Sequence, residues 1–197
     1  MNKLSVLGML VFAMLIGSAQ AQQSDIAFGV STTSAPPATF SSSVTNQQVS
    51  LTGGAYLSFG GDFLFFKHMG IGGNIAWRAS EAQTPSFQPY RPILWDIDGM
   101  WVPPLGKHAA AEFSAGIGAQ STRFYTNYYT CSFGCTNYAT STHFLGQFGG
   151  ALKLYAHGGF FVRPEFHLYL IANNVEYSSS HAFRYGGSIG YTFGGGH

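Results

Sequence analysis

Charge is what this sequence has least of. Asp, Glu, Lys and Arg together make up 9% of its 197 residues, against about 25% in ordinary soluble domains. The formal net charge is +1, so the composition offers neither the basic surface of a nucleic-acid-binding protein nor an acidic tail. Aromatic residues reach 16%, and there are 26 glycines. Few charges combined with many aromatics indicate a surface that contacts lipid, or one that a large protein partner covers.

Long apolar runs are equally scarce. One run, Leu4–Ile16, follows Lys3 and precedes the small-residue pattern Ala19-Gln20-Ala21. It is shorter than the roughly 20 residues of a transmembrane helix, and its flanks are those of a secretory signal peptide. We therefore predict a signal peptide over residues 1–21 and a mature domain over residues 22–197. With no later apolar run of sufficient length, the mature chain is expected to cross a membrane only as β-strands.

Cysteine is limited to Cys131 and Cys135, in the stretch CSFGC. An exported chain meets oxidising conditions, which favours a small-loop disulfide between these two residues. Two free thiols are the alternative. A single pair of cysteines does not supply the four ligands of a structural zinc site, so we predict no metal and no cofactor.

What the sequence does have is alternation with a period of two residues, which indicates strands with one apolar face. Eight segments show it: Asp25–Val30, Ala55–Phe66, Ile71–Ala79, Ile93–Val102, Ala111–Thr122, Phe144–Tyr155, Phe161–Leu170 and Phe183–Phe193. Charged residues and one histidine fall on the face opposite the apolar one. They are Asp62, Arg78, Asp96, Asp98, Glu112, Lys153, Arg163, Glu165, His167 and Arg184.

The connections between these segments alternate in length. Three are short and rich in Gly and Pro, at 67–70, 103–108 and 156–159. Four are longer and polar, at 31–50, 80–92, 126–142 and 173–181. Short turns at one end and long loops at the other are typical of outer-membrane barrels. We predict an all-β fold, an eight-stranded antiparallel up-and-down transmembrane β-barrel, with both termini at the short-turn end and the charges in the lumen.

The outward aromatic residues cluster towards the strand ends. Trp77, Trp95 and Tyr185 lie towards the long loops, whereas Trp101, Tyr191 and Phe193 lie towards the short turns. Two aromatic girdles around an aliphatic band mark the two interfaces of a membrane. A soluble secreted β-sandwich that uses its aromatic face for assembly is the alternative.

Two stretches carry a family resemblance. GGDFLFFKHMGIGGNIAWRAS (Gly60–Ser80) and YGGSIGYTF (Tyr185–Phe193) resemble eight-stranded bacterial outer-membrane barrels of the OmpA, OmpX and OmpW type. The second stretch is similar to the C-terminal signal that the barrel-insertion machinery reads, although Gly194–His197 follows its last aromatic residue. The resemblance implies a location in the outer membrane of a Gram-negative-type bacterium. It implies no single activity, because this fold hosts adhesins, channels and enzymes.

A catalytic acid–base site is the main alternative to a structural role for the lumen charges. Arg163, Glu165 and His167 alternate along one strand face, and a carboxylate beside a histidine can act as acid and base. However, eight strands leave a lumen only wide enough for packed side chains, where charges must be paired. We predict a polar plug, with Lys153 and Arg163 near Glu165 and Arg78 near Asp96. The His-x-Ser pair of barrel enzymes that deacylate lipid A is replaced by His167-Leu168-Tyr169, so we predict no enzymatic activity.

The loop over Thr126–Thr142 is the most distinctive predicted surface, because tyrosines flank its cysteine pair and it carries no charged residue. Such loops suit recognition of proteins or glycans, although a barrel rim at the lipid headgroups would have a similar composition. We predict a structural or surface-interaction role, with membrane lipid, the insertion machinery and an extracellular protein or glycan as partners. A narrow gated channel for small solutes is the alternative.

Overall fold

A computed structural model describes residues 23–36, 52–83, 87–131, 135–173 and 179–194, without the side chains of 127–136. The signal-peptide prediction lies outside these residues. Among the described residues there is no helix that is long and apolar enough to cross a membrane. The strands are β1 (Gln23–Ser34), β2 (Tyr56–Phe66), β3 (Met69–Arg78), β4 (Ala82–Gln83), β5 (Pro89–Trp101), β6 (Ala109–Cys131), β7 (Cys135–Tyr155), β8 (Phe160–Ile171) and β9 (His181–Phe193).

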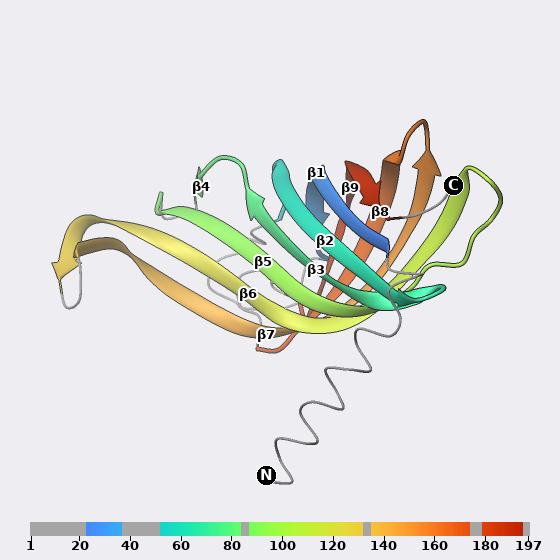
Figure 1. Cartoon of the computed structure of the whole chain (residues 1–197). Helices are drawn as coiled ribbons and strands as arrows, with labels where there is room; N and C mark the ends of the chain where they lie inside the picture. The colour runs from blue at the N-terminus through green and yellow to red at the C-terminus, as the bar shows by residue number, and fades with distance from the viewer. Residues whose placement is uncertain (1–22, 37–51, 84–86, 132–134, 174–178, 195–197) are drawn as a thin grey trace, which may run out of the picture.

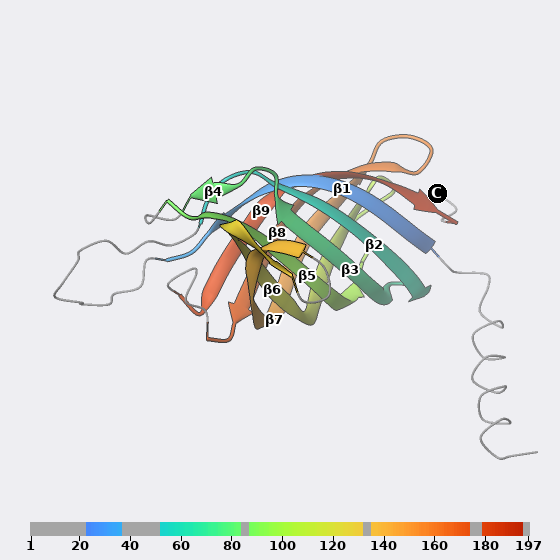
Figure 2. The same ribbon diagram turned by 90° about the vertical axis from the view of Figure 1, so that its left-hand side faces the viewer.

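The strands form one antiparallel sheet that closes on itself. Their order is β3-β2-β1-β9-β8-β7-β6-β5-β4, and a further pairing of β3 with β5 joins the two ends. The two-residue strand β4 only extends the edge of β5, so the wall consists of eight strands and the predicted fold class is confirmed. Figure 1 and Figure 2 show these strands curving around a common lumen. Closure leaves no unpaired strand edge along the wall.

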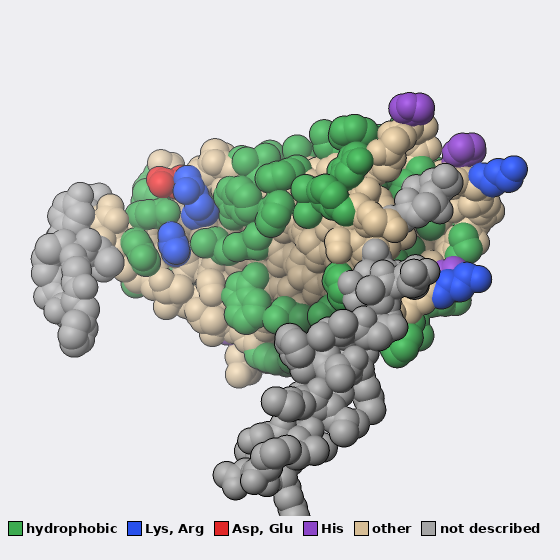
Figure 3. All heavy atoms as spheres, in the orientation of Figure 1, with side chains coloured by type: hydrophobic (Ala, Val, Ile, Leu, Met, Phe, Trp, Pro, Cys, Tyr) green, Lys and Arg blue, Asp and Glu red, His purple; other side chains and the backbone are tan. Residues whose placement is uncertain are grey.

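Strand β8 shows how the alternation divides the residues between the two faces. Val162 and Phe166 are exposed on the outside of the barrel, while Arg163 and Glu165 are buried inside it. Successive side chains of a strand point to opposite faces. Each apolar residue of β8 that faces outward is therefore followed by a residue that faces the lumen. In Figure 3, hydrophobic side chains gather between the charged side chains near the two ends of the visible face.

The lumen is filled in three zones. Leu64, Met100, Val102 and Ala110 form a buried apolar cluster towards the short turns. Charged side chains occupy the middle. A second apolar cluster closes the lumen towards the loops, and its members are Tyr56, Ala76, Leu94, Leu145, Tyr169, Ile171 and Ala182. The ion pairs of Lys153 and Arg163 thus lie between two apolar clusters.

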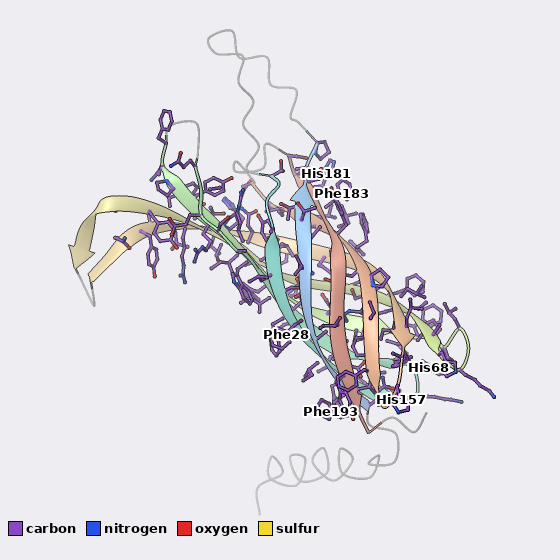
Figure 4. The ribbon with its side chains drawn as sticks, turned by 90° about the horizontal axis from the view of Figure 1, so that it is seen from above. Phe28, His68, His157, His181, Phe183 and Phe193 are labelled. Atoms are coloured by element: carbon purple, nitrogen blue, oxygen red, sulfur yellow. The ribbon has the colours of Figure 1, made fainter. Side chains whose placement is uncertain are left out.

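Both ends of the described barrel lie at the short-turn end, as predicted. Ser24 near the start of β1 pairs with Phe193 at the end of β9, and Gln23 pairs with Leu64. In Figure 4, Phe193 lies near His157 in the turn before β8. The turns at this end are tight, and Gly159 adopts a φ of 90°, which glycine tolerates because it has no Cβ.

The predicted loop over Thr126–Thr142 is wrong in one respect, because most of it is strand. β6 and β7 pair as far as Tyr125 and Tyr138, where the register shifts, and pair again at their ends, where Cys131 lies opposite Cys135. Figure 1 shows this β6–β7 hairpin projecting well beyond the other strands. Threonine and tyrosine favour strands, and strand pairing does not require the outward residues to be apolar. The period-two signal of apolar residues therefore ends before the strands do.

Two further strands extend beyond their predicted limits for the same reason. β1 continues to Ser34, where Val30 was the expected end, and β5 begins at Pro89, where Ile93 was the expected start. Each extension is paired with a neighbouring strand. The longer β5 and β6 bring two additional arginines, Arg91 and Arg123, onto the barrel wall.

Candidate functional site

Lys153 is the centre of the charged zone in the lumen. Its Nζ lies 2.6 Å from Asp25 Oδ2, 2.9 Å from Glu112 Oε2 and 3.2 Å from Asp62 Oδ2. These carboxylates come from β1, β6 and β2, so one ammonium group links strands on different sides of the barrel. The side chain of Lys153 is fully buried. A buried ammonium group requires such partners, because it has given up its hydration.

Arg163 on β8 connects the same carboxylates to the next layer. Its guanidinium lies 3.2 Å from Asp62 Oδ2, from Glu112 Oε1 and from Glu165 Oε2. Its Nε donates a hydrogen bond of 3.0 Å to Ser188 Oγ. The planar fork of arginine serves several acceptors at once. Lys153 and Arg163 together therefore hold four carboxylates in one network.

The network continues towards the loops through Glu165. Its Oε1 lies 3.6 Å from Arg184 Nη2 and 3.8 Å from His167 Nε2. The ring Nδ1 of His167 shares a hydrogen bond of 2.7 Å with the Gln147 amide. Arg184 is fully buried, and its guanidinium lies 5.9 Å from the centre of the Tyr169 ring. His167 and Glu165 are thus held by other side chains within the lumen.

The predicted pairing of Lys153 with Glu165 is wrong, whereas Arg163 does pair with Glu165. The register of β7 and β8 places Ala151 opposite Glu165 and carries Lys153 two residues further towards the short turns. There Lys153 meets Asp25, which is not among the predicted lumen charges. Asp25 directly precedes Ile26 in an alternating stretch, so its parity could have identified it.

The predicted pairing of Arg78 with Asp96 is also wrong. Asp96 lies opposite Asn74 on β3, four residues from Arg78. Arg78 instead lies at the loop end of the lumen, where its Nη1 donates a hydrogen bond of 3.0 Å to the Tyr90 hydroxyl. A Cβ on Gly54, whose φ is 83°, would lie 2.6 Å from that guanidinium. The glycine therefore allows the backbone to lie against Arg78.

Asp96 and Asp98 are buried on β5, where the neighbouring strand has glycines. The register places Gly118 opposite Asp96 and Gly116 opposite Asp98. A Cβ on Gly116 would overlap the Asp98 carboxylate. Gly116 therefore leaves space for the Asp98 carboxylate, whereas the absence of a Cβ at Gly118 lets the backbone of β5 approach closely at Trp95.

The predicted girdle residues lie on the outside of the wall. At the short-turn end, Trp101 stacks on Phe113 with ring centres 5.6 Å apart, and Tyr191 packs edge-on against Phe160 at 4.9 Å and Phe193 at 4.8 Å. Towards the loops, Trp77 lies opposite Ile93, Trp95 opposite Ile75, and Tyr185 opposite Thr32. Such offset and edge-to-face contacts are the preferred geometries of aromatic pairs.

Cys131 and Cys135 lie directly opposite each other at the end of the β6–β7 hairpin. Their side chains lie outside the described residues, so the disulfide stays a prediction. Within the described residues there is no group of three or more His, Cys, Asp or Glu side chains that could hold a metal ion.

No family model matches the chain, and no curated protein sequence matches it. Several solved structures match the chain. Ail of Yersinia pestis, in complex with the heparin analogue sucrose octasulfate, matches with a TM-score of 0.58 and 12% identity, over 87% of this chain and 99% of Ail. Neisserial surface protein A matches with a TM-score of 0.61 and 4% identity, over 88% and 97%.

The N-terminal β-barrel domain of OprF from Pseudomonas aeruginosa also matches, with a TM-score of 0.54 and 13% identity, over 88% of this chain and 98% of that domain. Each match extends over nearly the whole of the known barrel. At these identities the likeness concerns the fold. The chain has the fold of the eight-stranded bacterial outer-membrane β-barrels.

Proposed function

We propose that the protein is an integral outer-membrane barrel with a closed lumen that presents the β6–β7 hairpin at the cell surface. The observation that carries the membrane location is the outer face of the wall, where large apolar side chains are exposed. Phe28, Ile97, Ile117 and Ile189 are each at least 60% exposed. A continuous apolar face of this kind is unfavourable in water and matches the lipid-facing band of known barrels.

The height of this band agrees with a membrane. Ten residues of β5 separate Trp101 at the short-turn end from Arg91 at the loop end. At about 3.4 Å per residue they extend about 34 Å, or about 26 Å along the barrel axis for a strand tilt of about 40°. Apolar bands of outer-membrane barrels are about 25 Å tall. The wall therefore fits the hydrocarbon layer with Trp101 and Arg91 at its two edges.

The β6–β7 hairpin is the part of the chain that best fits a surface-interaction role. β5 pairs with β6 only as far as Phe124, and β8 pairs with β7 only from Leu145. Beyond these positions, within the described residues, no strand pairs with the outer edges of the hairpin. The edge of a strand in a projecting hairpin can pair with an added strand from another protein. Tyr125 and Tyr138, with ring centres 6.1 Å apart, are adjacent aromatic contacts for such a partner.

Insertion and surface binding are tested separately. We expect the mature chain to fold into phosphatidylcholine liposomes, to migrate faster on unheated than on boiled electrophoresis samples, and to resist extraction by carbonate. Recovery as a soluble protein would contradict the membrane proposal.

Liposomes bearing the protein should adhere to a layer of epithelial cells, and a variant whose hairpin is cut back to a two-residue Asn-Gly turn after Phe124 should not. Equal adhesion by the folded short-hairpin variant would contradict the role of the hairpin.

The closed lumen favours this proposal over the alternative of a narrow gated channel. Apolar clusters lie on both sides of the ion pairs of Lys153 and Arg163. Planar bilayers containing the protein should therefore show no discrete current steps. Steps that persist in the purified protein would support the channel.

We also propose that the protein is not an enzyme, because His167 and Glu165 are enclosed by lumen side chains.

A further inference from the structure

Two arginines stand apart from every other charge on the strands of the barrel. Arg91 on β5 and Arg123 on β6 are register partners, directly opposite each other. Tyr90 and Pro92 on either side of Arg91 are buried, as is Thr122 beside Arg123, so both arginines point outward. Among the described residues, all other charged side chains of the strands point into the lumen.

Among the residues that the structure describes, the charge of this pair is only partly compensated. Glu81 Oε1 lies 3.9 Å from Arg91 Nη2, and both side chains are well exposed, at 47% and 33%. Such an exposed contact contributes little. The guanidinium of Arg123 lies 4.9 Å from the centre of the Tyr138 ring, which provides no counter-charge. Arg91 Nε is buried and has no hydrogen-bond partner. Like charges directly opposite each other on adjacent strands destabilise a sheet.

The register gives the position of the two arginines along the wall. Trp77 and Ile93 face each other on β3 and β5, and Ile93 faces Ser121 on β6. The arginines follow two residues further towards the loops, about 5 Å higher along the axis. If the wall lies in a membrane as proposed above, the arginines lie just beyond its hydrocarbon edge. Lipid phosphates lie at that level.

We propose that Arg91 and Arg123 form a binding site for the phosphate group of a lipid in the outer leaflet. Guanidinium groups bind phosphate through paired, charge-assisted hydrogen bonds, and two of them side by side match the several oxygens of a phosphomonoester. The lipid origin of the phosphate follows from the surroundings, because its acyl chains would lie against Trp77 and Ile93. On the other side of the barrel, the corresponding outward positions of β1 and β9 hold Thr32, Ser34 and Phe183. The site is therefore on one side of the wall.

The test uses the full mature chain in nanodiscs that contain phosphatidylcholine with a minor fraction of phosphatidic acid, which has a phosphomonoester headgroup. Native mass spectrometry after release from the nanodisc reports which lipids stay bound. We expect the wild type to retain phosphatidic acid about tenfold more than an Arg91→Gln/Arg123→Gln variant. The matched control is Lys67→Gln/Lys107→Gln, which removes the same charge from the exposed turns at the other end of the barrel and should retain the lipid as the wild type does.

Several outcomes would overturn the proposal. Equal retention by the wild type and the arginine variant would do so, as would an equal loss in the lysine control, which would show a general effect of net charge. Displacement of the lipid by soluble methyl phosphate at a matching concentration would identify a site for free phosphate instead. Failure of the wild type to enter nanodiscs would overturn the membrane proposal, and this one with it. Normal insertion without enrichment of phosphatidic acid would overturn only the phosphate site.

Discussion

Lys153 Nζ lies 2.6 Å from Asp25 Oδ2, and both side chains are buried. The two residues are 128 positions apart in the sequence, and their strands, β7 and β1, are separated in the wall by β8 and β9. The ion pair therefore spans the lumen and joins the first strand of the barrel to a strand on another side. It therefore couples the early and late parts of the chain.

Replacing Lys153 with Met should destabilise the barrel strongly. The substitution removes the cation paired with Asp25 in the described part of the chain and weakens the charge compensation of Asp62 and Glu112, which keep Arg163. Uncompensated buried charge typically costs about 3–5 kcal/mol. Urea unfolding in liposomes, followed by tryptophan fluorescence, measures the loss. Lys67→Met, in an exposed turn, is the control, and an equal stability of the two variants would refute a structural role for the network.

Gly116→Ala should destabilise the barrel because its methyl group would overlap the Asp98 carboxylate. Overpacking of this kind costs about 1–3 kcal/mol. Gly150→Ala is the matched control on the neighbouring strand β7, since nothing lies within 4 Å of its added Cβ. The same unfolding assay compares the two. If the alanine at 116 is tolerated as well as the one at 150, the lumen is roomier at Asp98 than the structure indicates.

Ile117→Lys tests which face of the wall meets lipid. Ile117 is 61% exposed and lies near the middle of β6, where a lysine in lipid should cost about 2–4 kcal/mol. Ser121→Lys is the control, because Ser121 also faces outward but lies near the loop end, where the cost falls to about 0–1 kcal/mol. Unfolding from liposomes of fixed composition measures both. A soluble protein would tolerate the two lysines alike, so the absence of a depth dependence would count against a membrane-spanning wall.

The cysteine pair is tested by thiol labelling. If Cys131 and Cys135 form the predicted disulfide at the end of the β6–β7 hairpin, the unfolded, oxidised protein should take up no maleimide before reduction and two equivalents after it. Because the bond closes a loop of few residues, its removal should change global stability little. Two equivalents bound without a reductant would show free thiols in the exported protein.

Alternation along the sequence was enough to predict the wall, because each side chain of a strand faces either the outside or the lumen, and nearly all of the strand charges face the lumen. It placed Arg163 and Glu165 together correctly, since they are close along one strand. It did not place Lys153, because its partners come from three other strands and depend on how the strands are staggered. It also missed Arg91 and Arg123, because they lie where the apolar signal has ended and the strand pairing has not.

The sequence by itself determined the number of strands in the wall, the direction of most side chains and the closed barrel with an apolar outer face, since these follow from local residue patterns and the cost of burying charge. Only the tertiary structure decided which charges meet. Register sets Asp25 against Lys153 in the lumen and Arg91 beside Arg123 on the outer face towards the loops. A shift of two residues would preserve every inward and outward assignment while exchanging all of these partners. Strand stagger, which no single segment encodes, is the physical reason.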